Sequence, residues 1–267
     1  MPELPEIICR ASEMNRELPG RRIAAIEILQ PKCLNVEADE FQRALSDATI
    51  QAVTQRGKWL FIHTTQGWLL INLGMGGEVL LTDREHMPEK YRLVFDFEDG
   101  ACLAVNFWWF GYAHYVAEDL LAEHRLTSHI GPNALEATPP FLAERFAGQR
   151  TRLKSWLLNQ ENVAGIGNAY IHDILYLARL HPQRAVNSLS PEEIEALVQA
   201  IHRGLEPSIA CGGAFYEKNL YGQNGGFRHE DIIVGYREGQ PCPTCATPIV
   251  KIKTGSTSSF ICPTCQV

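Results

Sequence analysis

Apolar residues recur with two different periods along the chain, and the change of period separates a strand-rich region from a helical one. Residues 3–18 have an apolar stripe with the spacing of one helix face, and Pro19 and Gly20 end this helix. From residue 23 to about residue 116, apolar and polar positions alternate, and glycine-containing turns separate the runs. The pattern predicts a leading helix followed by an antiparallel β-sandwich.

The second half of the chain has helical periodicity. It follows a polar stretch and a double proline at 139–140, and its clearest helix start is Ser190, with Pro191 in the first position and Glu193 in the third. A glycine-rich loop over residues 212–227 then leads to a short β segment. We therefore expect an α+β multidomain protein.

Composition places the chain among ordinary globular proteins. Its 267 residues are 45% hydrophobic and 21% charged. No apolar run approaches the roughly 18–20 residues that cross a bilayer, and no signal peptide is visible, so we expect a cytoplasmic protein with no membrane partner. The net charge of −7 speaks against nucleic acid, but residues 145–184 hold six basic and two acidic side chains, a local net charge of +4. A locally basic groove is thus compatible with the negative net charge of the whole chain.

Four of the eight cysteines form two Cys-x-x-Cys pairs with 16 residues between them. Both pairs read CPTC, and four converging thiolates make a closed tetrahedral Zn²⁺ site, which is structural and not catalytic. The alternatives are four unligated cysteines or an iron–sulfur cluster, whose usual spacings are closer. The residues between the pairs alternate like a β-hairpin that turns near residues 254–256. The zinc ligands would be Cys242, Cys245, Cys262 and Cys265.

A turn containing Gly165 and Gly167 separates two helical stretches within residues 157–182, and the second helix is expected to begin near Asn168. Backbone amides at a helix start form a natural phosphate site, and Lys154 lies just upstream. The alternative is a tight connection between two helices with no ligand.

Several short segments carry a family resemblance. PELPE at the N-terminus, QRGKWL, LGMGG, VAGIGNAY, LHP and the final CPTCQ occur in one order over essentially the whole length. The chain resembles the formamidopyrimidine-DNA glycosylase/endonuclease VIII family of base-excision repair enzymes. The resemblance implies an N-terminal β-sandwich with a leading helix, a helix–two-turn–helix domain that binds DNA, and a four-cysteine zinc finger. The corresponding ranges are 1–130, 141–235 and 236–267, with a hinge at 131–140.

The resemblance also implies that Met1 is removed and that the new terminal Pro2 is the nucleophile. An α-amino group has a pKa of about 8, so part of it is neutral at pH 7. Its attack on C1′ of the sugar expels the base and leaves an iminium, an electron sink that allows loss of a C2′ proton and of the 3′ phosphate. Glu3 matches the family's general acid–base, and Glu6 matches a second carboxylate three residues on. The alternative for both acids is compensation of the helix dipole.

Other matches concern contacts with DNA. Lys58, in QRGKWL, matches a family lysine on a hairpin that approaches the DNA backbone at the lesion; its alternative is an exposed strand lysine. Lys154, the amide of Gly167 and Asn168 resemble groups that grip the phosphates flanking the flipped nucleotide. Such contacts position the protein and carry no sequence information.

One departure from the family lies in the zinc finger. The family presents an arginine near the tip of this hairpin, where the present chain has Thr257. A hydroxyl cannot make a bidentate phosphate contact. Either Lys253 or Arg237 replaces the arginine, or binding across the lesion is weaker and the lyase step less efficient.

A second departure concerns the side chains that fill the space of a flipped base. The family often uses Met, Arg and Phe; Met75 and Phe110 match, but NFWWFG places Trp108 where the arginine would read the partner base. An indole stacks well but reads poorly, so we expect weak discrimination between opposite bases. The alternative places one of Trp108 and Trp109 in the core.

Two further positions differ near the expected active site. Asn72 takes the place of a family histidine, and Glu78 would face either a lesion or water. The expected function is a DNA glycosylase with AP lyase activity, acting as a monomer with one structural Zn²⁺ on damaged double-stranded DNA. The changes put 8-oxoguanine in doubt as the substrate. The alternatives are a specialist for pyrimidine or bulky lesions with weak lyase activity, and a non-catalytic binder of damaged DNA.

Overall fold

The computed structural model describes residues 1–255 and 257–267, so Ser256, in the predicted hairpin turn, lies outside the described residues. The chain forms two compact units. The first comprises residues 1–129 and 211–226, and the second comprises residues 130–210 and 227–267. In the described part of the chain, no helix is both long and apolar enough to cross a membrane.

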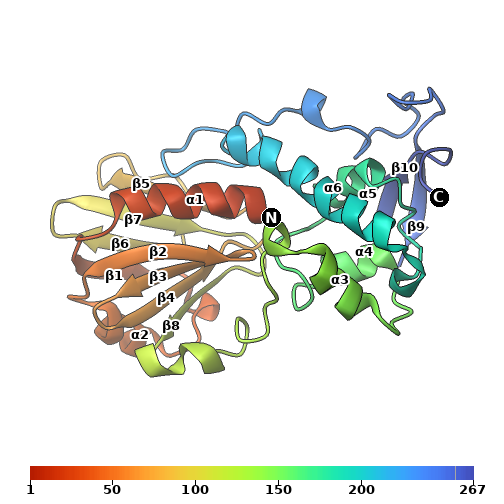
Figure 1. The fold of residues 1–267 in the computed structure, drawn as a ribbon. Coiled ribbons are helices and arrows are strands. Elements are labelled where there is room, and N and C mark those ends of the chain that lie inside the picture. The colour runs from red at the N-terminus through yellow and green to blue at the C-terminus, as the bar shows by residue number, and fades with distance from the viewer. Residues whose placement is uncertain (256) are drawn as a thin grey trace. The chain divides into compact units, whose positions relative to one another are not determined.

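The first unit is a β-sandwich of two four-stranded antiparallel sheets with a leading helix, as expected (Figure 1). One sheet has the order β1-β6-β7-β5 and the other β2-β3-β4-β8. The first sheet consists of β1 (Ile23–Ile28), β5 (Glu78–Asp83), β6 (Leu93–Phe97) and β7 (Ala101–Asn106). The second consists of β2 (Ile50–Arg56), β3 (Trp59–Thr64), β4 (Gly67–Asn72) and β8 (Tyr112–Val116).

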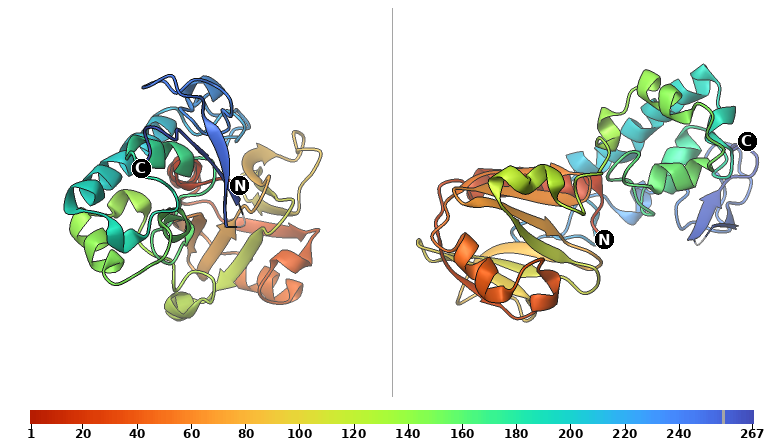
Figure 2. Two further views of the ribbon diagram at one scale, coloured as in Figure 1. Left: turned by 90° about the vertical axis from the view of Figure 1, so that its right-hand side faces the viewer. Right: turned by 90° about the horizontal axis from the view of Figure 1, so that it is seen from below.

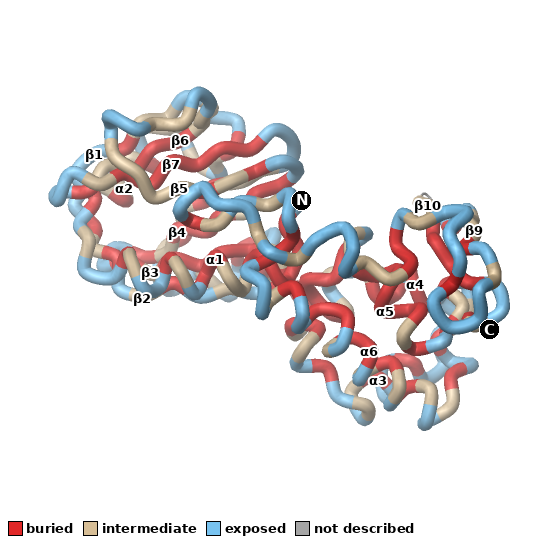
Figure 3. Tube along the Cα trace, turned by 90° about the horizontal axis from the view of Figure 1, so that it is seen from above, coloured by how far each residue is buried: buried red, intermediate tan, exposed pale blue. Residues whose placement is uncertain are grey.

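The core of the first unit lies between the two sheets and under two helices, α1 (Leu4–Glu17) and α2 (Ala38–Leu45) (Figures 2 and 3). Ile7 and Met14 of α1 belong to the same buried cluster as strand residues such as Ile62 and Phe95. Each strand residue on an inner face removes apolar surface from water, which is the main stabilising term for a sandwich of this kind. The packing fixes α1, and therefore the start of the chain, on the sandwich.

The second unit is helical and ends in a β-hairpin. Its helices are α3 (Pro139–Phe146), α4 (Leu153–Leu158), α5 (Ile171–Leu177) and α6 (Pro191–Ala210), and its hairpin is β9 (Val250–Thr254) with β10 (Thr257–Ile261). The predicted start of α6 is confirmed: Ser190 N–H donates to Glu193 Oε2 at 2.8 Å, and Glu193 N–H donates to Ser190 Oγ at 3.2 Å. This reciprocal capping box satisfies two backbone donors that the first turn would otherwise leave unpaired.

The return of residues 211–226 to the first unit was not indicated by the sequence, which places this stretch after a helix of the second unit. Short-range patterns identify a glycine-rich loop but contain no information about which distant surface it packs on. The four-part division of the chain at 1–130, 131–140, 141–235 and 236–267 stays a prediction.

Candidate active site and nucleic-acid interface

The start of α1 buries two carboxylates beside Pro2. Only 5% of Glu3 and 4% of Glu6 is exposed. Glu6 accepts a hydrogen bond from Glu3 N–H at Oε2 (2.8 Å) and another from Ala214 N–H at Oε1 (3.1 Å). Glu6 therefore holds both the first turn of the helix and the returning segment, and its two oxygens have fixed directions.

The returning segment reaches Glu6 because of a glycine. Gly213 has a φ of +102°, a left-handed conformation that side chains rarely adopt, and an added Cβ would lie 3.2 Å from Glu6 Cγ. A larger residue would therefore strain the backbone and press on the carboxylate.

Lys58 lies on the turn between β2 and β3, and its ammonium interacts electrostatically with this pair of acids. Burial lowers the pKa of Lys58, while Glu3 and Glu6 oppose the shift. Asn72 fixes the turn from the neighbouring strand, because its Nδ2 donates to Lys58 O at 3.1 Å and its Oδ1 accepts from Gly74 N–H at 3.0 Å. Both ends of the Asn72 amide thus form hydrogen bonds with backbone groups, and these contacts position the turn that carries Lys58.

Four large apolar side chains are exposed together at two adjacent loops of the first unit. Met75 is 51% exposed, Trp108 61%, Trp109 65% and Phe110 72%. The loops are joined by hydrogen bonds from Met75 N–H to Trp109 O (2.8 Å) and from Trp108 N–H to Met75 O (3.3 Å). The alternative that one tryptophan belongs to the core is wrong, because the loop bends away from the sandwich instead of continuing the strand alternation. An exposed apolar group of this size indicates a binding surface.

Glu78, at the start of β5, does not simply face water. Its Oε2 lies 2.8 Å from Lys218 Nζ, and its side chain is 19% exposed. Lys218 belongs to the returning segment, so this ion pair is a further link between that segment and the sandwich. Neutralisation by Lys218 makes Glu78 a weaker candidate for a lone acceptor toward a lesion.

The glycine turn of the second unit is closed by a side-chain amide. Gln160 accepts from Gly165 N–H at 2.8 Å and donates to Ile166 O at 3.0 Å, and Gly165 has a φ of +103°. Gly167 is buried within the turn, whereas Asn168 is exposed, three residues before α5 begins at Ile171. The predicted contact of Gly167 is through its backbone amide and that of Asn168 through its side chain, and both stay predictions.

Lys154 is not the surface cation that a phosphate grip suggests. It is 2% exposed, and its Nζ donates to Thr257 Oγ1 (3.1 Å), Ser258 O (2.5 Å) and, more weakly, Thr254 Oγ1 (3.4 Å). These acceptors use all three donors of the ammonium. Burial lowers the pKa of Lys154 to about 8. In this structure Lys154 fixes the hairpin from beneath, and Thr257 is one of its partners.

Two other cations were candidates to replace the family arginine. Arg237 donates to the backbone oxygens of His229 (3.1 Å) and Glu230 (3.0 Å), so its guanidinium fixes its own loop. Lys253, on β9, has an exposed side chain. Of the two, only Lys253 has no hydrogen bond or ion pair to its side chain among the described contacts.

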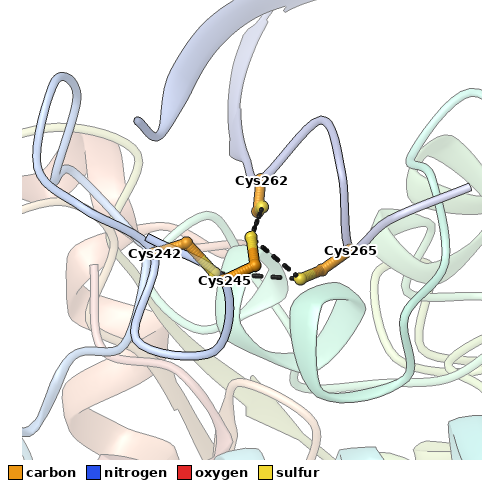
Figure 4. Close-up of side chains that lie close together, drawn as sticks. All are labelled: Cys242, Cys245, Cys262 and Cys265. Carbon is orange, nitrogen blue, oxygen red and sulfur yellow. Dashed lines mark hydrogen bonds between the residues drawn. The ribbon is translucent and has the colours of Figure 1, made fainter. Parts of the chain in front are cut away.

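The four predicted zinc ligands converge at the base of the hairpin (Figure 4). Their sulfur atoms lie within 4.8 Å of one another, with separations of 3.8 Å between Cys242 and Cys265, 3.4 Å between Cys245 and Cys262, and 3.5 Å between Cys245 and Cys265. Disulfide sulfurs would be about 2.05 Å apart. A tetrahedron with Zn–S bonds of about 2.3 Å has sulfurs about 3.8 Å apart. The donor set therefore fits one structural Zn²⁺.

Two supporting residues of the second unit were missed by the sequence reasoning. Asp173, in α5, accepts backbone N–H groups of Ile233 (2.7 Å), Val234 (2.9 Å) and Gly235 (2.9 Å), which fixes the approach to the finger. The hydroxyl of Tyr176, one turn on, lies 3.3 Å from Cys242 Sγ. The available signal was an acid within an otherwise apolar helical stretch, which is costly to bury without partners.

Comparisons with known proteins agree over the whole chain. Three family models match: the N-terminal domain of formamidopyrimidine-DNA glycosylase at residues 1–106, its H2TH domain at 130–219, and a zinc finger found in FPG and IleRS at 239–267. The formamidopyrimidine-DNA glycosylase of Chloroflexus aurantiacus is 35% identical, covering 100% of this chain and 98% of that protein. The one from Pectobacterium atrosepticum is 32% identical, with 100% of both covered.

Solved structures of formamidopyrimidine-DNA glycosylases also match the fold of this chain. A Lactococcus lactis FPG mutant in complex with DNA containing Fapy-dG has a TM-score of 0.91 at 28% identity, and the L. lactis Fpg complex with abasic-site DNA has 0.91 at 27% identity. Each match covers 99% of both chains. The fold and the site thus define a DNA-binding base-excision glycosylase with a structural zinc finger. The chain belongs to the formamidopyrimidine-DNA glycosylase family.

Proposed function

We propose that this enzyme excises a damaged base from double-stranded DNA through a covalent bond between C1′ and the nitrogen of Pro2, freed by removal of Met1. The observation that carries the proposal is the gathering of Glu3, Glu6 and Lys58 at the buried start of α1. Glu3 supplies the general acid, Glu6 orders the first turn of the helix, and Lys58 supplies the cation. The enzyme acts as a monomer in the cytoplasm, associated with the nucleoid when bound to DNA.

The chemistry follows from the groups at this site. The damaged nucleotide leaves the stack, and the neutral secondary amine of Pro2 attacks C1′ as the base departs. Glu3 protonates O4′, the sugar ring opens, and a positively charged iminium joins the protein to the sugar. That cation draws electrons from C2′, so a base removes the C2′ proton and the 3′ phosphate leaves. Lys58 balances the negative charge of the phosphate at the lesion.

Borohydride trapping on a panel of lesion-containing duplexes tests this function. The iminium is reduced to a stable amine, so we expect a covalent protein–DNA adduct on every substrate from which base is released. DNA with formamidopyrimidine and abasic sites comes first, because related proteins were crystallised with such DNA. A protein that binds damaged duplex but releases no base and forms no adduct would be a non-catalytic binder, and the proposal would be wrong.

The same reactions measure strand cleavage. Equal cleavage with and without alkali indicates an efficient lyase, whereas additional cleavage after alkali indicates excision with a weak lyase step. Thr257 favours the second result, because it replaces a bidentate cation with a hydroxyl and its Oγ1 accepts a hydrogen bond from Lys154.

A specialist for pyrimidine or bulky lesions is the second candidate. The supporting observation is the exposed group of Met75, Trp108, Trp109 and Phe110, which offers stacking surfaces in place of a reading arginine. The lesion panel decides between the candidates, since a specialist releases oxidised pyrimidines or bulky adducts faster than 8-oxoguanine.

We expect Trp108→Ala to weaken binding to lesion duplexes by about 5- to 150-fold, since stacking contributes about 1–3 kcal/mol per base. The loss should be the same opposite each of the four bases, because an indole stacks without reading hydrogen bonds. Dissociation constants on four duplexes measure it, and Trp109→Ala, equally exposed, is the matched control with the smaller loss. A loss that depends on the opposite base, or a larger loss for Trp109→Ala, would contradict this role.

A further inference from the structure

The returning segment, residues 211–226, is fixed along one face of α1 by three carboxylates of that helix. Ala214 N–H donates to Glu6 (3.1 Å), Leu220 N–H to Glu13 (2.8 Å), and the Tyr221 hydroxyl to Glu17 (2.7 Å). Glu6, Glu13 and Glu17 recur at helical spacing, so they share one face. The contacts determine where the intervening residues of the segment lie.

Glu217 lies between these contacts and faces the start of the chain. Its side chain is 11% exposed, and its Oε1 lies 3.6 Å from the amino nitrogen of Met1. The charged groups that act on it from α1 are Glu6 and Arg10, and Arg10 is itself paired with Glu13 at 2.8 Å. On its own segment, the neighbouring Lys218 is paired with Glu78. The ion-pair partner of Glu217 is therefore the amino terminus.

The protonation of Glu217 is poised near neutrality. Burial raises the pKa of Glu217 to about 7, and Glu6 acts in the same direction, while the amino terminus and Arg10 oppose the shift. A free α-amino group has a pKa of about 8. Proton transfer between groups of such similar pKa has little free-energy cost in either direction.

We propose that Glu217 is the proton acceptor for the Pro2 nitrogen, an inference that rests on the proposed function. Removal of Met1 moves the amino terminus by one residue, and consecutive Cα atoms are about 3.8 Å apart, so the new terminal nitrogen forms next to the nitrogen that Glu217 already faces. Glu6 already accepts two backbone N–H groups, and the Glu3 side chain accepts from the first turn of α1. Glu217 is the carboxylate whose partner is the terminal amine.

The step is a balanced proton transfer. The secondary ammonium of Pro2 carries two protons, and one passes to a carboxylate oxygen of Glu217, which leaves a neutral amine and a neutral carboxylic acid. The freed lone pair forms the N–C1′ bond while the bond from C1′ to the base breaks, and its electron pair leaves with the base. As the O4′–C1′ bond opens, O4′ takes a proton from Glu3, and the second amine proton passes to the Glu3 carboxylate so formed, which leaves the positively charged iminium.

Single-turnover borohydride trapping of full-length, zinc-loaded enzyme between pH 5.5 and 9 tests the proposal. Glu217 accepts a proton only when it is ionised, so the wild-type rate should fall as the pH drops below about 7. Glu217→Gln keeps the shape but cannot accept a proton. We expect its rate at pH 7.5 to be about 100-fold lower, at the small end of general-base effects, with the inflection near pH 7 replaced by that of the amine itself, at about pH 8.

Two further variants separate proton acceptance from anchoring of the segment. Glu13→Gln weakens the contact with Leu220 and should retain the inflection whatever its rate. Glu217→Asp keeps a carboxyl group one methylene further away and should retain the inflection with a rate loss of at least about threefold. If Glu217→Gln does not fold, the rate and pH profile of Glu217→Asp test whether Glu217 accepts the proton.

Three results are distinguishable. A Glu217→Gln profile that superimposes on the wild-type profile, or an unchanged rate for Glu217→Asp, overturns the role of Glu217 and leaves the proposed function intact. The absence of any adduct with wild-type enzyme, on substrates from which base is released, overturns the proposed function itself. Loss of the inflection near pH 7 with abasic-DNA affinity within about twofold of wild type supports the assignment.

Discussion

A Pro2→Gly variant that retains Met1 is expected to form no borohydride-stable adduct, with base release reduced by at least about 1,000-fold. The nitrogen of residue 2 then belongs to a peptide bond, where resonance removes its lone pair from nucleophilic use. The amine of Met1 is one residue too far along to replace it. Intact mass establishes that Met1 is present, and gel-resolved trapping measures the adduct.

Lys58 is the other amine at this site that could attack C1′, because burial lowers the pKa of its ammonium and so increases its neutral fraction. Peptide mapping of the wild-type adduct distinguishes Pro2 from Lys58 directly. Pro5→Ala is the matched control: it changes the other proline at the start of α1, in the first turn of the helix, and should retain the adduct. An adduct on Lys58, or trapping by Pro2→Gly with Met1 in place, would show that the terminal nitrogen is not the nucleophile.

Removal of zinc is expected to unfold the finger and abolish tight binding to DNA. Zinc binding to such four-ligand sites contributes about 10–16 kcal/mol in zinc-finger peptides, which is more than a short two-stranded hairpin contributes by itself. Cys262→Ser removes a fully buried ligand. Metal content, thermal unfolding and the dissociation constant for abasic-site DNA measure the effect.

The control for this change is Cys211→Ser, an exposed cysteine of the first unit that is not among the metal-site residues. It should keep the metal, the unfolding profile and the affinity of wild-type protein. The first unit has its own core, so its thermal transition should survive chelation. Tight DNA binding by metal-free protein would mean that the hairpin is held by Lys154 and its packing alone, contrary to the expectation.

Local patterns explain how much of the fold was predicted. The start of α6 depends on hydrogen bonds between Ser190 and Glu193, three residues apart, so the letters contain both partners. Strand alternation predicts the sandwich because successive side chains point to opposite faces. The paired cysteine spacing predicts the zinc site because each turn brings two thiolates together. In all three cases the interacting groups are close along the chain.

The features that the sequence did not predict depend on groups that lie far apart along the chain. Lys154 was expected to contact a phosphate, which stays a prediction, but its hydrogen bond to Thr257, 103 residues away, was not foreseen. Asp173 received no role, yet it fixes Val234, 61 residues along. One tryptophan of the 108–109 pair was assigned to the core as an alternative, but a loop bend exposes both. Such partners become neighbours only after two elements pack, and hydropathy along the chain does not encode which elements those are.

The amino-acid sequence by itself determined the class of fold, the four metal ligands and, through ordered motifs, the family; the role of Pro2 stays a prediction. Only the tertiary structure decided which charged groups surround that proline. Two of the three contacts of residues 211–226 with α1 use backbone N–H groups, which every non-proline residue carries, so the sequence gives no sign of them. The return of this segment to α1 changes the surroundings of Glu217 from a water-exposed loop to a nearly buried position beside an amine, and burial of this kind shifts protonation toward neutral pH.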